Sequence, residues 1–536
     1  MAFNYANSER TVDKQPVSAT TKPVSKPNMV PNSTGGFVFQ LTPLKALERF
    51  LILGSESPTY YATARDLTES NCTNAKKAIQ DTPSAVLDMI CDISKTGRAP
   101  KQGPTLFVLS LFFKYADPHW KYQASLRAGE IIRTFTHLAT FMNFLTQFHS
   151  VSRPIRRIIN KWYTEKDASA VYYQYAKYGN REGWKHKDIL ALAHVKPTTE
   201  GLAVLFNHMF GDADDDALSA VFQQHKLDTA LRSAKTEKEI LNILDSGDAQ
   251  WEQVPTLWLK SAKVWEKLLP SMGITALLRS MGRISSTGLF SGGMTNALKL
   301  TVSNLTNLDA IRKGRVHPIQ VLAAYLTYKN GRAAKGDTSW PVNAHIVGAL
   351  ENMYFMSFKA IEPTNLNYYI GVDTSGSMGC GTIAGIPGLT PKIASACLAA
   401  ERVKTEPWTE VAGFSSRLVD LKMHKNDTLA DSIQKVGRGD VACTNPGLLI
   451  EDAIKRGLPV DVFMMITDNE VNHGSHPFML LKKYRQTMKR DAKLVVVGMT
   501  ATNFTLADPS DGGMLDIVGF DTSAPAAIRD FSLNGI

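Results

Sequence analysis

The chain has 536 residues, of which 44% are hydrophobic and 21% charged, and this composition is typical of globular proteins. The length exceeds what one hydrophobic core normally serves, so we expect two or more domains. The sequence lacks both a long uninterrupted apolar run and the apolar centre of a signal peptide near its start, so we expect no membrane span. Five scattered cysteines without pair spacing favour a reducing compartment, and we expect a cytoplasmic protein.

The net charge of +10 is unevenly distributed along the chain. Residues 362–536 contain 17 Lys/Arg against 20 Asp/Glu, which leaves 43 against 30 of the totals for residues 1–361. The first part therefore has a balance of +13 and the second part a balance of −3. This asymmetry indicates an anionic partner for the first part, and the alternative is a soluble basic surface without a partner.

The first two segments of the chain differ in pattern. Residues 1–36 are rich in Ser, Thr, Pro, Asn and Lys without apolar periodicity, which predicts a disordered polar tail. Residues 37–361 carry apolar residues at three- and four-residue spacing in stretches such as "EIIRTFTHLATFMNFLTQFH" and "KEILNILDS". The aspartates of "GDADDDALSAV" suit a helix N-terminus. A long run of short helices without strands predicts stacked HEAT-like helical repeats.

From residue 362 to residue 536, short apolar strands alternate with helical stretches. The predicted strands are "NYYIGVD", "EVAGFS", "VDVFMMITD", "KLVVVGM" and "MLDIVGF". Between them lie helical stretches such as "PKIASACLAAERVK" and "NPGLLIEDAIKR". This alternation predicts a doubly wound α/β domain, in which helices cover both faces of a parallel sheet.

A polar cluster is predicted at the strand ends of this second domain. Asp373 ends "NYYIGVD", and Ser375 and Ser377 follow at alternate positions of a glycine-containing loop. Asp468 ends "VDVFMMITD", and Thr444 lies in the polar loop "RGDVACTNPGLL". Ligands collect at the carboxyl ends of parallel strands, so these five side chains can converge if the two strands are neighbours. Oxygen ligands with few carboxylates suit one Mg²⁺ ion, with Mn²⁺ as the alternative.

The order Asp-x-Ser-x-Ser, Thr and Asp resembles the metal-ion-dependent adhesion site of von Willebrand factor A domains. An ion with so few charged ligands stays electrophilic and can accept a carboxylate from an acidic protein partner. An aspartyl phosphotransferase also places Asp after a strand, but it needs a second carboxylate two residues on, where this chain has Ser375. We therefore expect no catalytic residues and no enzymatic activity, with a magnesium-dependent hydrolase as the remote alternative.

Longer stretches resemble the Ro autoantigen family, which joins a TROVE module to a von Willebrand factor A domain. The resemblance covers about residues 37–536 and is carried by "KYGNREGWKHKDILALAHVKP", "GRVHPIQVLAAYLTYKNG", "MITDNE" and "VGMTATNFTLADPSDGGMLDIVGFDTSAP". It implies a monomeric ring of helical repeats over residues 37–361, closed by the A domain over residues 362–536. "NPG" after Thr444 departs from the animal members and favours a bacterial or distant member.

The resemblance also implies the partners. Family members bind small noncoding Y-type RNA on the outside of the ring and single-stranded ends of misfolded RNA through its hole. We expect the same RNA quality-control role here, with a ribonuclease or another protein as a further partner at the metal site. The alternative is a protein-adhesion scaffold that recruits an acidic partner through the A domain, in which the basic ring is incidental.

Candidate RNA-binding residues lie in three basic stretches. In "RPIRRIINKWYTEK", three cations share one helix face at four-residue spacing, with a solvated face as the alternative. In "KYGNREGWKHKD", cations and a histidine gather in a short turn between helices. In "EIIRTFTHLATF", an arginine and a histidine lie one turn apart and could line the ring interior. These candidates are Arg153, Arg157, Lys161, Lys177, Arg181, Lys185, His186, Lys187, Arg133 and His137.

Overall fold

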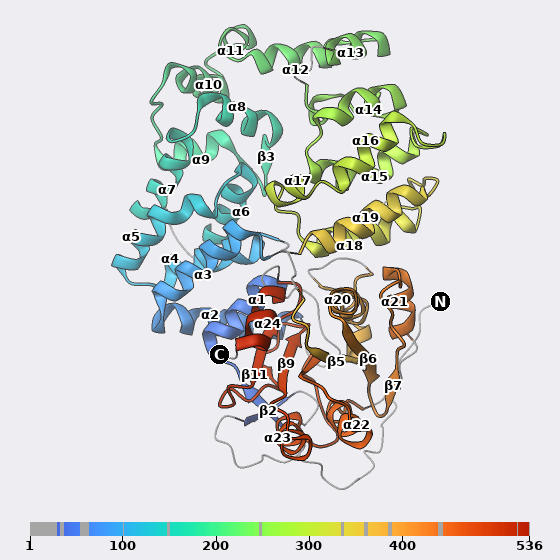
Figure 1. Ribbon diagram of the computed structural model, residues 1–536. Helices are drawn as coiled ribbons and strands as arrows, with labels where there is room; N and C mark the ends of the chain where they lie inside the picture. Colours follow the sequence, from blue (N-terminus) through green and yellow to red (C-terminus); the bar gives the residue numbers. More distant parts are fainter. Residues whose placement is uncertain are drawn as a thin grey trace, which may run out of the picture.

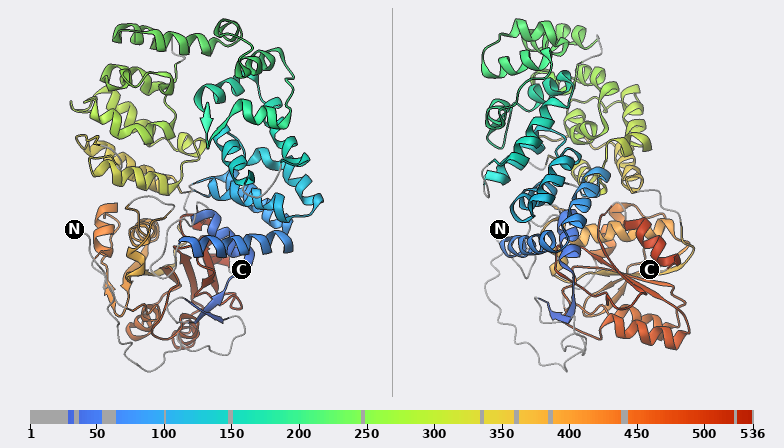
Figure 2. Two further views of the ribbon diagram at one scale, coloured as in Figure 1. Left: turned by 180° about the vertical axis from the view of Figure 1, so that it is seen from behind. Right: turned by 90° about the vertical axis from the view of Figure 1, so that its left-hand side faces the viewer.

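The computed structural model describes residues 29–32, 37–53, 64–99, 101–146, 151–245, 249–333, 337–358, 363–383, 388–437, 443–521 and 524–534. A curved array of helices leaves one side of an α/β domain and returns to it (Figure 1). In the two further views the array again rises from the α/β domain, turns at α11–α13 and returns (Figure 2). This arrangement confirms the predicted fold class, helical repeats followed by a doubly wound domain.

The helical array contains α1 to α19 in chain order. Their bounds are α1 (Pro43–Leu53), α2 (Ala64–Asp81), α3 (Pro83–Thr96), α4 (Gly103–Tyr115), α5 (Pro118–Arg127), α6 (Phe135–Thr146), α7 (Arg153–Thr164), α8 (Ala168–Lys177), α9 (His186–Ala193), α10 (Glu200–Phe210), α11 (Asp215–Val221), α12 (Gln223–Ser233), α13 (Glu237–Leu244), α14 (Ala262–Leu268), α15 (Ile274–Ser286), α16 (Asn296–Leu305), α17 (Leu308–Lys313), α18 (Pro318–Lys329) and α19 (Ala344–Met356). A two-stranded ribbon, β3 (Asn180–Arg181) and β4 (Trp184–Lys185), lies between α8 and α9. No helix among the described residues combines the length and the hydropathy that a bilayer crossing requires.

Local sequence signals explain where many of these helices begin. Asp214 accepts a hydrogen bond from the Ala217 backbone N–H at 2.9 Å and caps α11, as "GDADDD" predicted. Proline occupies the first turn of α3, α4, α5, α7 and α18, where its missing N–H breaks no helical hydrogen bond. The helices are short, and they are stabilised by packing their apolar faces against neighbouring helices.

The α/β domain is built on a six-stranded sheet with the order β11-β9-β8-β5-β6-β7, in which only β7 is antiparallel to its neighbour. Helices α20, α21 and α24 lie on the side of the array, and α22 and α23 lie on the opposite side (Figure 1). The bounds are β5 (Asn367–Asp373), α20 (Pro391–Thr405), β6 (Trp408–Phe414), β7 (Leu418–Asp420), α21 (Leu429–Val436), α22 (Leu448–Arg456), β8 (Val462–Thr467), α23 (Pro477–Met488), β9 (Lys493–Gly498), β10 (Phe504–Thr505), β11 (Met514–Val518) and α24 (Ala524–Asn534). The five predicted strands are confirmed as β5, β6, β8, β9 and β11. The predicted boundary at residue 362 lies outside the described residues.

The start of the chain contributes to the α/β domain. β1 (Met29–Pro31) pairs antiparallel with β2 (Phe37–Gln40), and β2 pairs with β10. The prediction of a disordered tail over residues 1–36 is therefore wrong for Met29–Pro31, while residues 1–28 and 33–36 lie outside the described residues. Local composition did not reveal this strand, because β1 pairs with β2 and β2 is in turn held by β10, far along the chain.

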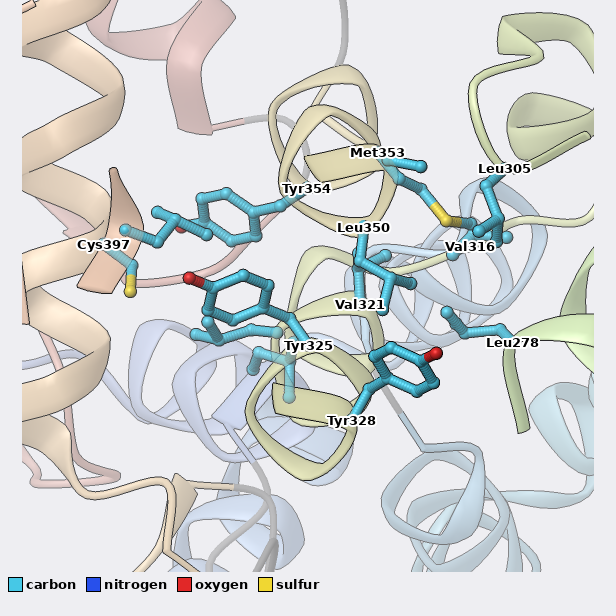
Figure 3. Packing of buried hydrophobic residues seen from close by; sticks show 14 of the residues in the cluster. Leu278, Leu305, Val316, Val321, Tyr325, Tyr328, Leu350, Met353, Tyr354 and Cys397 are labelled. Carbon is cyan, nitrogen blue, oxygen red and sulfur yellow. The ribbon is translucent and has the colours of Figure 1, made fainter. Parts of the chain in front are cut away.

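The two ends of the helical array contact each other and the α/β domain. The His317 ring, at the start of α18, hydrogen-bonds through Nε2 to the Arg98 carbonyl oxygen at 2.9 Å. The Arg98 guanidinium donates through Nε to the Asp521 carboxylate at 3.0 Å. Tyr325 of α18 and Tyr354 of α19 face Cys397 of α20 in one continuous buried cluster (Figure 3). The array is thus closed into a ring through the α/β domain.

Candidate metal centre and nucleic-acid surfaces

The sheet topology brings the predicted metal ligands to one edge. β5 and β8 are parallel neighbours, with Val372 opposite Ile466, so Asp373 and Asp468 both emerge at the carboxyl end of the sheet. The Thr467 hydroxyl donates to Asp373 Oδ2 at 2.6 Å, and the Ser375 backbone N–H donates to Asp373 Oδ1 at 2.9 Å. This pairing of strands satisfies the condition on which the sequence-based prediction depended.

The loop after β5 directs its two serines to a common point. The Ser375 and Ser377 hydroxyl oxygens lie 3.0 Å apart, and both side chains are buried. The Ser377 hydroxyl lies near enough to Asp468 to lower the pKa of that carboxyl, against the larger effect of burial. Asp373, Ser375, Ser377 and Asp468 therefore form one connected buried group.

Thr444 reaches the same sheet edge through backbone contacts on both sides. Ser415 is the residue after β6. Its hydroxyl donates to the Cys443 carbonyl at 3.2 Å, and its backbone carbonyl accepts from the Asn445 N–H at 3.0 Å. The Thr444 N–H donates to Asn472 Oδ1 at 2.9 Å, and Asn472 follows the Asp468 loop. The Thr444 side chain is buried. These contacts hold Thr444 between the end of β6 and the loop that carries Asp468.

The electrostatics of this group fit a divalent cation. Burial, together with the nearby Asp468 carboxylate, raises the pKa of Asp373 to about 7. Burial also raises the pKa of Asp468. The Oδ2 atom of Asp468 is buried and has no hydrogen-bond partner among the described residues. A cation would offset the repulsion between the two carboxylates and give this oxygen a partner.

The donor set determines which ion fits. The described residues contain no group of three or more His, Cys, Asp or Glu able to hold a metal, so hydroxyl oxygens would have to complete this site. Two carboxylates with the hydroxyls of Ser375, Ser377 and Thr444 form an all-oxygen set, which hard ions such as Mg²⁺ or Mn²⁺ prefer. The residues present therefore fit the predicted ion.

A cavity of about 1110 Å³ lies within the helical array. Helices α15 and α18 supply much of its lining, and Lys101 and the turn at Thr256 come from other parts of the array. The described residues that line it include no Asp or Glu. Its four cations are Lys101, Lys260, Arg279 and Arg283.

These four cations are exposed, and none has an ion-pair partner within the described part of the chain. By contrast, Lys177 forms an ion pair with Glu252 at 2.8 Å, and Arg127 pairs with Glu130 at 2.9 Å. The cavity is thus a concave surface with uncompensated positive charge. Such a surface attracts polyanions, because each neutralised phosphate releases counterions.

The predicted cations of α7 differ in how far they are open to solvent. Ile155, Ile158, Ile159 and Trp162 are buried, as their spacing predicted. Arg153 is exposed, and the Arg157 guanidinium stacks 4.7 Å from the centre of the Tyr122 ring, which is 45% exposed. Lys161 pairs with Glu165 at 3.3 Å within the helix. Of the three, Arg153 and Arg157 are better placed to meet a ligand.

The cations around β3 and β4 are also at the surface. Lys185 and Lys187 are exposed, and Arg181 stacks 5.2 Å from the Tyr178 ring centre. Lys177 is half-buried in its ion pair with Glu252. Lys185, Lys187 and Arg181 therefore form a small basic surface around the β3–β4 ribbon, near α7.

The structure contradicts the predicted base contact of His186. Its ring is 1% exposed and stacks on Phe135 with ring centres 3.5 Å apart. Nδ1 hydrogen-bonds the Tyr163 hydroxyl at 2.9 Å, and burial lowers the pKa of His186 to about 3. The imidazole is thus a neutral core residue, whereas its charged sequence neighbours point outwards.

Arg133 and His137 are likewise engaged within the array. Arg133 donates to the Ser94 hydroxyl at 2.6 Å and to the Glu130 carbonyl at 2.7 Å. His137 bonds the Ile131 carbonyl at 3.2 Å, and its pKa falls to about 4 because of burial and the nearby Arg133 charge. Neither residue lines the cavity, and both are engaged in helix packing, so their predicted place along the ring interior stays a prediction.

Sequence reasoning missed the cavity cations. Arg279 and Arg283 are spaced by four in "LLRSMGRIS" and share a face of α15, which is the signal used for α7. Lys101 lies in a loop and Lys260 ends a short 3-10 helix (Trp258–Lys260), and neither carries a comparable signal. Thr467 was also missed, although it precedes Asp468 directly.

Comparison with known proteins identifies the architecture. The TROVE domain family matches residues 30–248 and 246–343, and the Ro60 vWA domain family matches residues 367–532. The RNA-binding protein RO60 of Deinococcus radiodurans is 33% identical over 512 residues, which cover 94% of this chain and 95% of that protein. The protein of the same name from Caenorhabditis elegans is 28% identical over 585 aligned positions, which cover 94% of this chain and 90% of that protein.

Comparison with a solved structure supports the same architecture. The crystal structure of the Deinococcus radiodurans RO (RSR) protein superposes with a TM-score of 0.68 at 31% identity, covering 92% of this chain and all of that one. A helical TROVE ring closed by a von Willebrand factor A domain is therefore the class of protein that the fold defines. The chain belongs to the Ro family.

Proposed function

We propose that this protein binds RNA and that its cavity receives a single-stranded segment. The observation that carries the proposal is the concave lining with Lys101, Lys260, Arg279 and Arg283 and no carboxylate among its described residues. Unpaired cations on a concave surface follow a flexible phosphate backbone well, because the strand can bend to meet them. The RNA-binding names of two relatives support the same partner class.

The basic surface on α7 and around the β3–β4 ribbon suggests a second RNA-binding mode. Arg153, Arg157, Arg181, Lys185 and Lys187 lie on α7 and around the β3–β4 ribbon. Double-stranded RNA is read mainly by shape and phosphate contacts, for which exposed cations are suited. We infer that a structured small noncoding RNA of the Y type binds here, while single-stranded ends of misfolded RNA enter the cavity.

We infer that the protein acts as a binding scaffold in RNA quality control and not as an enzyme. Two sites for different features of one RNA class would allow a bound structured RNA to limit access to the cavity. The buried carboxylates at the sheet edge, the strongest candidates for chemistry, would serve as ligands of the proposed metal ion.

Fluorescence anisotropy with two RNAs would test the two surfaces. The RNAs are a blunt duplex and the same duplex with a single-stranded 3′ tail. The cavity variant Lys260→Gln/Arg279→Gln/Arg283→Gln should lose the preference for the tailed RNA. The second variant, Arg153→Gln/Lys185→Gln/Lys187→Gln, should keep that preference but weaken the binding of the blunt duplex. Equal binding of blunt and tailed RNA by the unmodified protein would contradict the cavity assignment.

A metal-dependent protein contact is the second candidate function. When bound, Mg²⁺ would act as a Lewis acid that accepts an oxygen ligand from a partner. Asp373, Ser375, Ser377, Thr444 and Asp468 would hold the ion, and the low number of carboxylates would leave it attractive to an acidic side chain. A ribonuclease or another protein that presents such a carboxylate would be recruited to the RNA-bearing ring.

Isothermal titration with Mn²⁺ and Mg²⁺ would test the metal site directly. The unmodified protein should bind one divalent ion, and Asp373→Ala should abolish binding because it removes one of only two carboxylates. Asp452→Ala is a matched control, since this carboxylate lies on α22 and pairs with Arg456. Unchanged binding by Asp373→Ala would rule out this assignment.

A further inference from the structure

The N-terminal strands lie against the part of the α/β domain that follows the metal-ligating Asp468. β2 pairs through Phe39 with Thr505 of β10, and Val38 and Phe39 are buried. The Phe39 ring packs edge-on against His476 and Phe478, with ring centres 5.5 and 5.6 Å away. Figure 1 shows β2 beside α23, on the side of the domain away from the helical array.

Asn32, directly after β1, contacts the metal-site loop itself. Its side chain is 7% exposed, and its Nδ2 atom donates to the Val471 carbonyl at 2.7 Å and to the Asn469 carbonyl at 3.5 Å. Both carbonyls belong to the segment immediately after Asp468. One side-chain amide from the start of the chain therefore connects two points of this loop.

The loop makes a sharp turn directly after Asp468. Asn469 has a φ of 65°, in the left-handed region, which asparagine adopts more readily than other non-glycine residues. Its side-chain oxygen accepts from the Leu506 N–H at 3.1 Å, just after β10. The Glu470 N–H donates to Asp468 Oδ1 at 2.9 Å, so the turn also orients the ligand carboxylate. Any change of this turn would move that carboxylate.

We propose that Asn32 is a positioning residue for the metal site and that the strands at residues 29–40 are part of the structure that supports it. The inference rests on the proposed function of the site. Asn32 does not reach the ion; it holds the turn that points Asp468 at it. Residues that orient metal ligands affect affinity strongly, typically by roughly 10- to 100-fold when replaced.

A Mn²⁺ titration of the full-length chain would test this inference. Asn32→Ala should weaken Mn²⁺ binding by about 10-fold or more. Asn367→Ala is the matched control, because Asn367 also donates its amide to a backbone carbonyl, that of Pro459, at 2.8 Å, but at the opposite end of β5. The control should bind Mn²⁺ within about twofold of the unmodified protein. The electron paramagnetic resonance spectrum of bound Mn²⁺ should change in the Asn32 variant only.

The possible outcomes separate this inference from the metal site itself. Thermal unfolding without metal shows whether each variant is folded at the titration temperature. If Asn32→Ala is unfolded there, Asn32→Leu, which fills nearly the same volume without the amide, takes its place. Unchanged Mn²⁺ affinity in a folded Asn32 variant, with binding lost in Asp373→Ala, would overturn the positioning role alone. Absence of Mn²⁺ binding by the unmodified protein would overturn both proposals.

Discussion

The fully buried guanidinium of Arg49, in α1, forms a two-point ion pair with Asp516 in β11, with N–O distances of 2.6 and 2.7 Å. The same side chain donates to the Thr502 hydroxyl at 3.1 Å and to the Phe504 carbonyl at 2.9 Å. This contact ties the first helix of the ring to the sheet of the A domain. Because the guanidinium is fully buried, water cannot take the place of Asp516 as its partner.

Arg49→Ala should lower the free energy of unfolding strongly, because it leaves the Asp516 carboxylate without its partner. Removing one member of a buried pair typically costs about 3–5 kcal/mol. Arg456→Ala is the control, since this arginine is 43% exposed in its pair with Glu410 and should cost less than about 1 kcal/mol. Chemical denaturation of both variants measures the difference, and equal losses would contradict the structural role of Arg49.

His317 should make stability depend on pH. Its Nδ1 accepts from the Ile319 N–H at 3.2 Å while Nε2 bonds the Arg98 carbonyl, an arrangement that requires the neutral ring. Burial lowers its pKa to about 4, despite the nearby Asp521 carboxylate, which acts in the opposite direction. The unfolded chain therefore binds more protons between about pH 6.5 and pH 4, and stability should fall as pH falls through this window.

The size of this effect can be measured against a His317→Asn variant, which keeps a helix-capping side chain without a titrating ring. The charged neighbours Arg98, Asp521, Glu48 and Asp92 stay unchanged in both proteins. Denaturation at pH 7 and pH 4 should show a further loss of up to about 3 kcal/mol in the unmodified protein. Parallel pH profiles for the two proteins would show that His317 does not contribute.

The cavity cations should determine the salt dependence of single-stranded RNA binding. Each phosphate contact contributes about 0.7 to the slope of log affinity against log salt for a single strand. Arg279→Gln/Arg283→Gln should therefore reduce the slope by about 1.4. Lys482→Gln/Lys483→Gln, exposed on α23 in the A domain, provides a charge-matched control that should leave the slope unchanged. Equal slopes in all three proteins would place the RNA elsewhere.

Substitution of His186 should affect stability, whereas substitution of its charged neighbours should affect RNA binding. His186→Ala leaves the buried Tyr163 hydroxyl without this partner and should cost about 1–3 kcal/mol. Lys185→Gln/Lys187→Gln should leave stability nearly unchanged while weakening the binding of a structured RNA. Thermal unfolding and anisotropy distinguish the two cases. If the His186→Ala protein folded with normal stability but lost RNA binding, the result would support a direct contact between His186 and RNA, against the structure.

Features that depend on nearby residues were predictable from the sequence. The spacing of Ile155, Ile158 and Trp162 predicted the buried face of α7, because residues three and four apart share a helix face. Asp373 and Asp468 at strand ends predicted a common sheet edge, because parallel strands in a doubly wound sheet end together. The two aspartates converge because β5 and β8 are neighbouring strands of the sheet.

Features that depend on distant residues were decided by the tertiary structure alone. His186 stands among exposed cations in the sequence, yet its ring is buried between Phe135 and Tyr163 of other helices. In the sequence, Asn32 lies in a polar segment. The pairing of β1 with β2 and of β2 with β10 places it against the α/β domain.

The order of helices and strands and the ligand types at the sheet edge were thus predictable from the sequence, since both follow from local periodicity and from the chemistry of single residues. That Lys101 and Lys260 share a cavity with Arg279 became visible in the folded structure alone. The physical reason is that the path of a helical ring depends on packing angles summed over many helix pairs, and no local pattern records that sum.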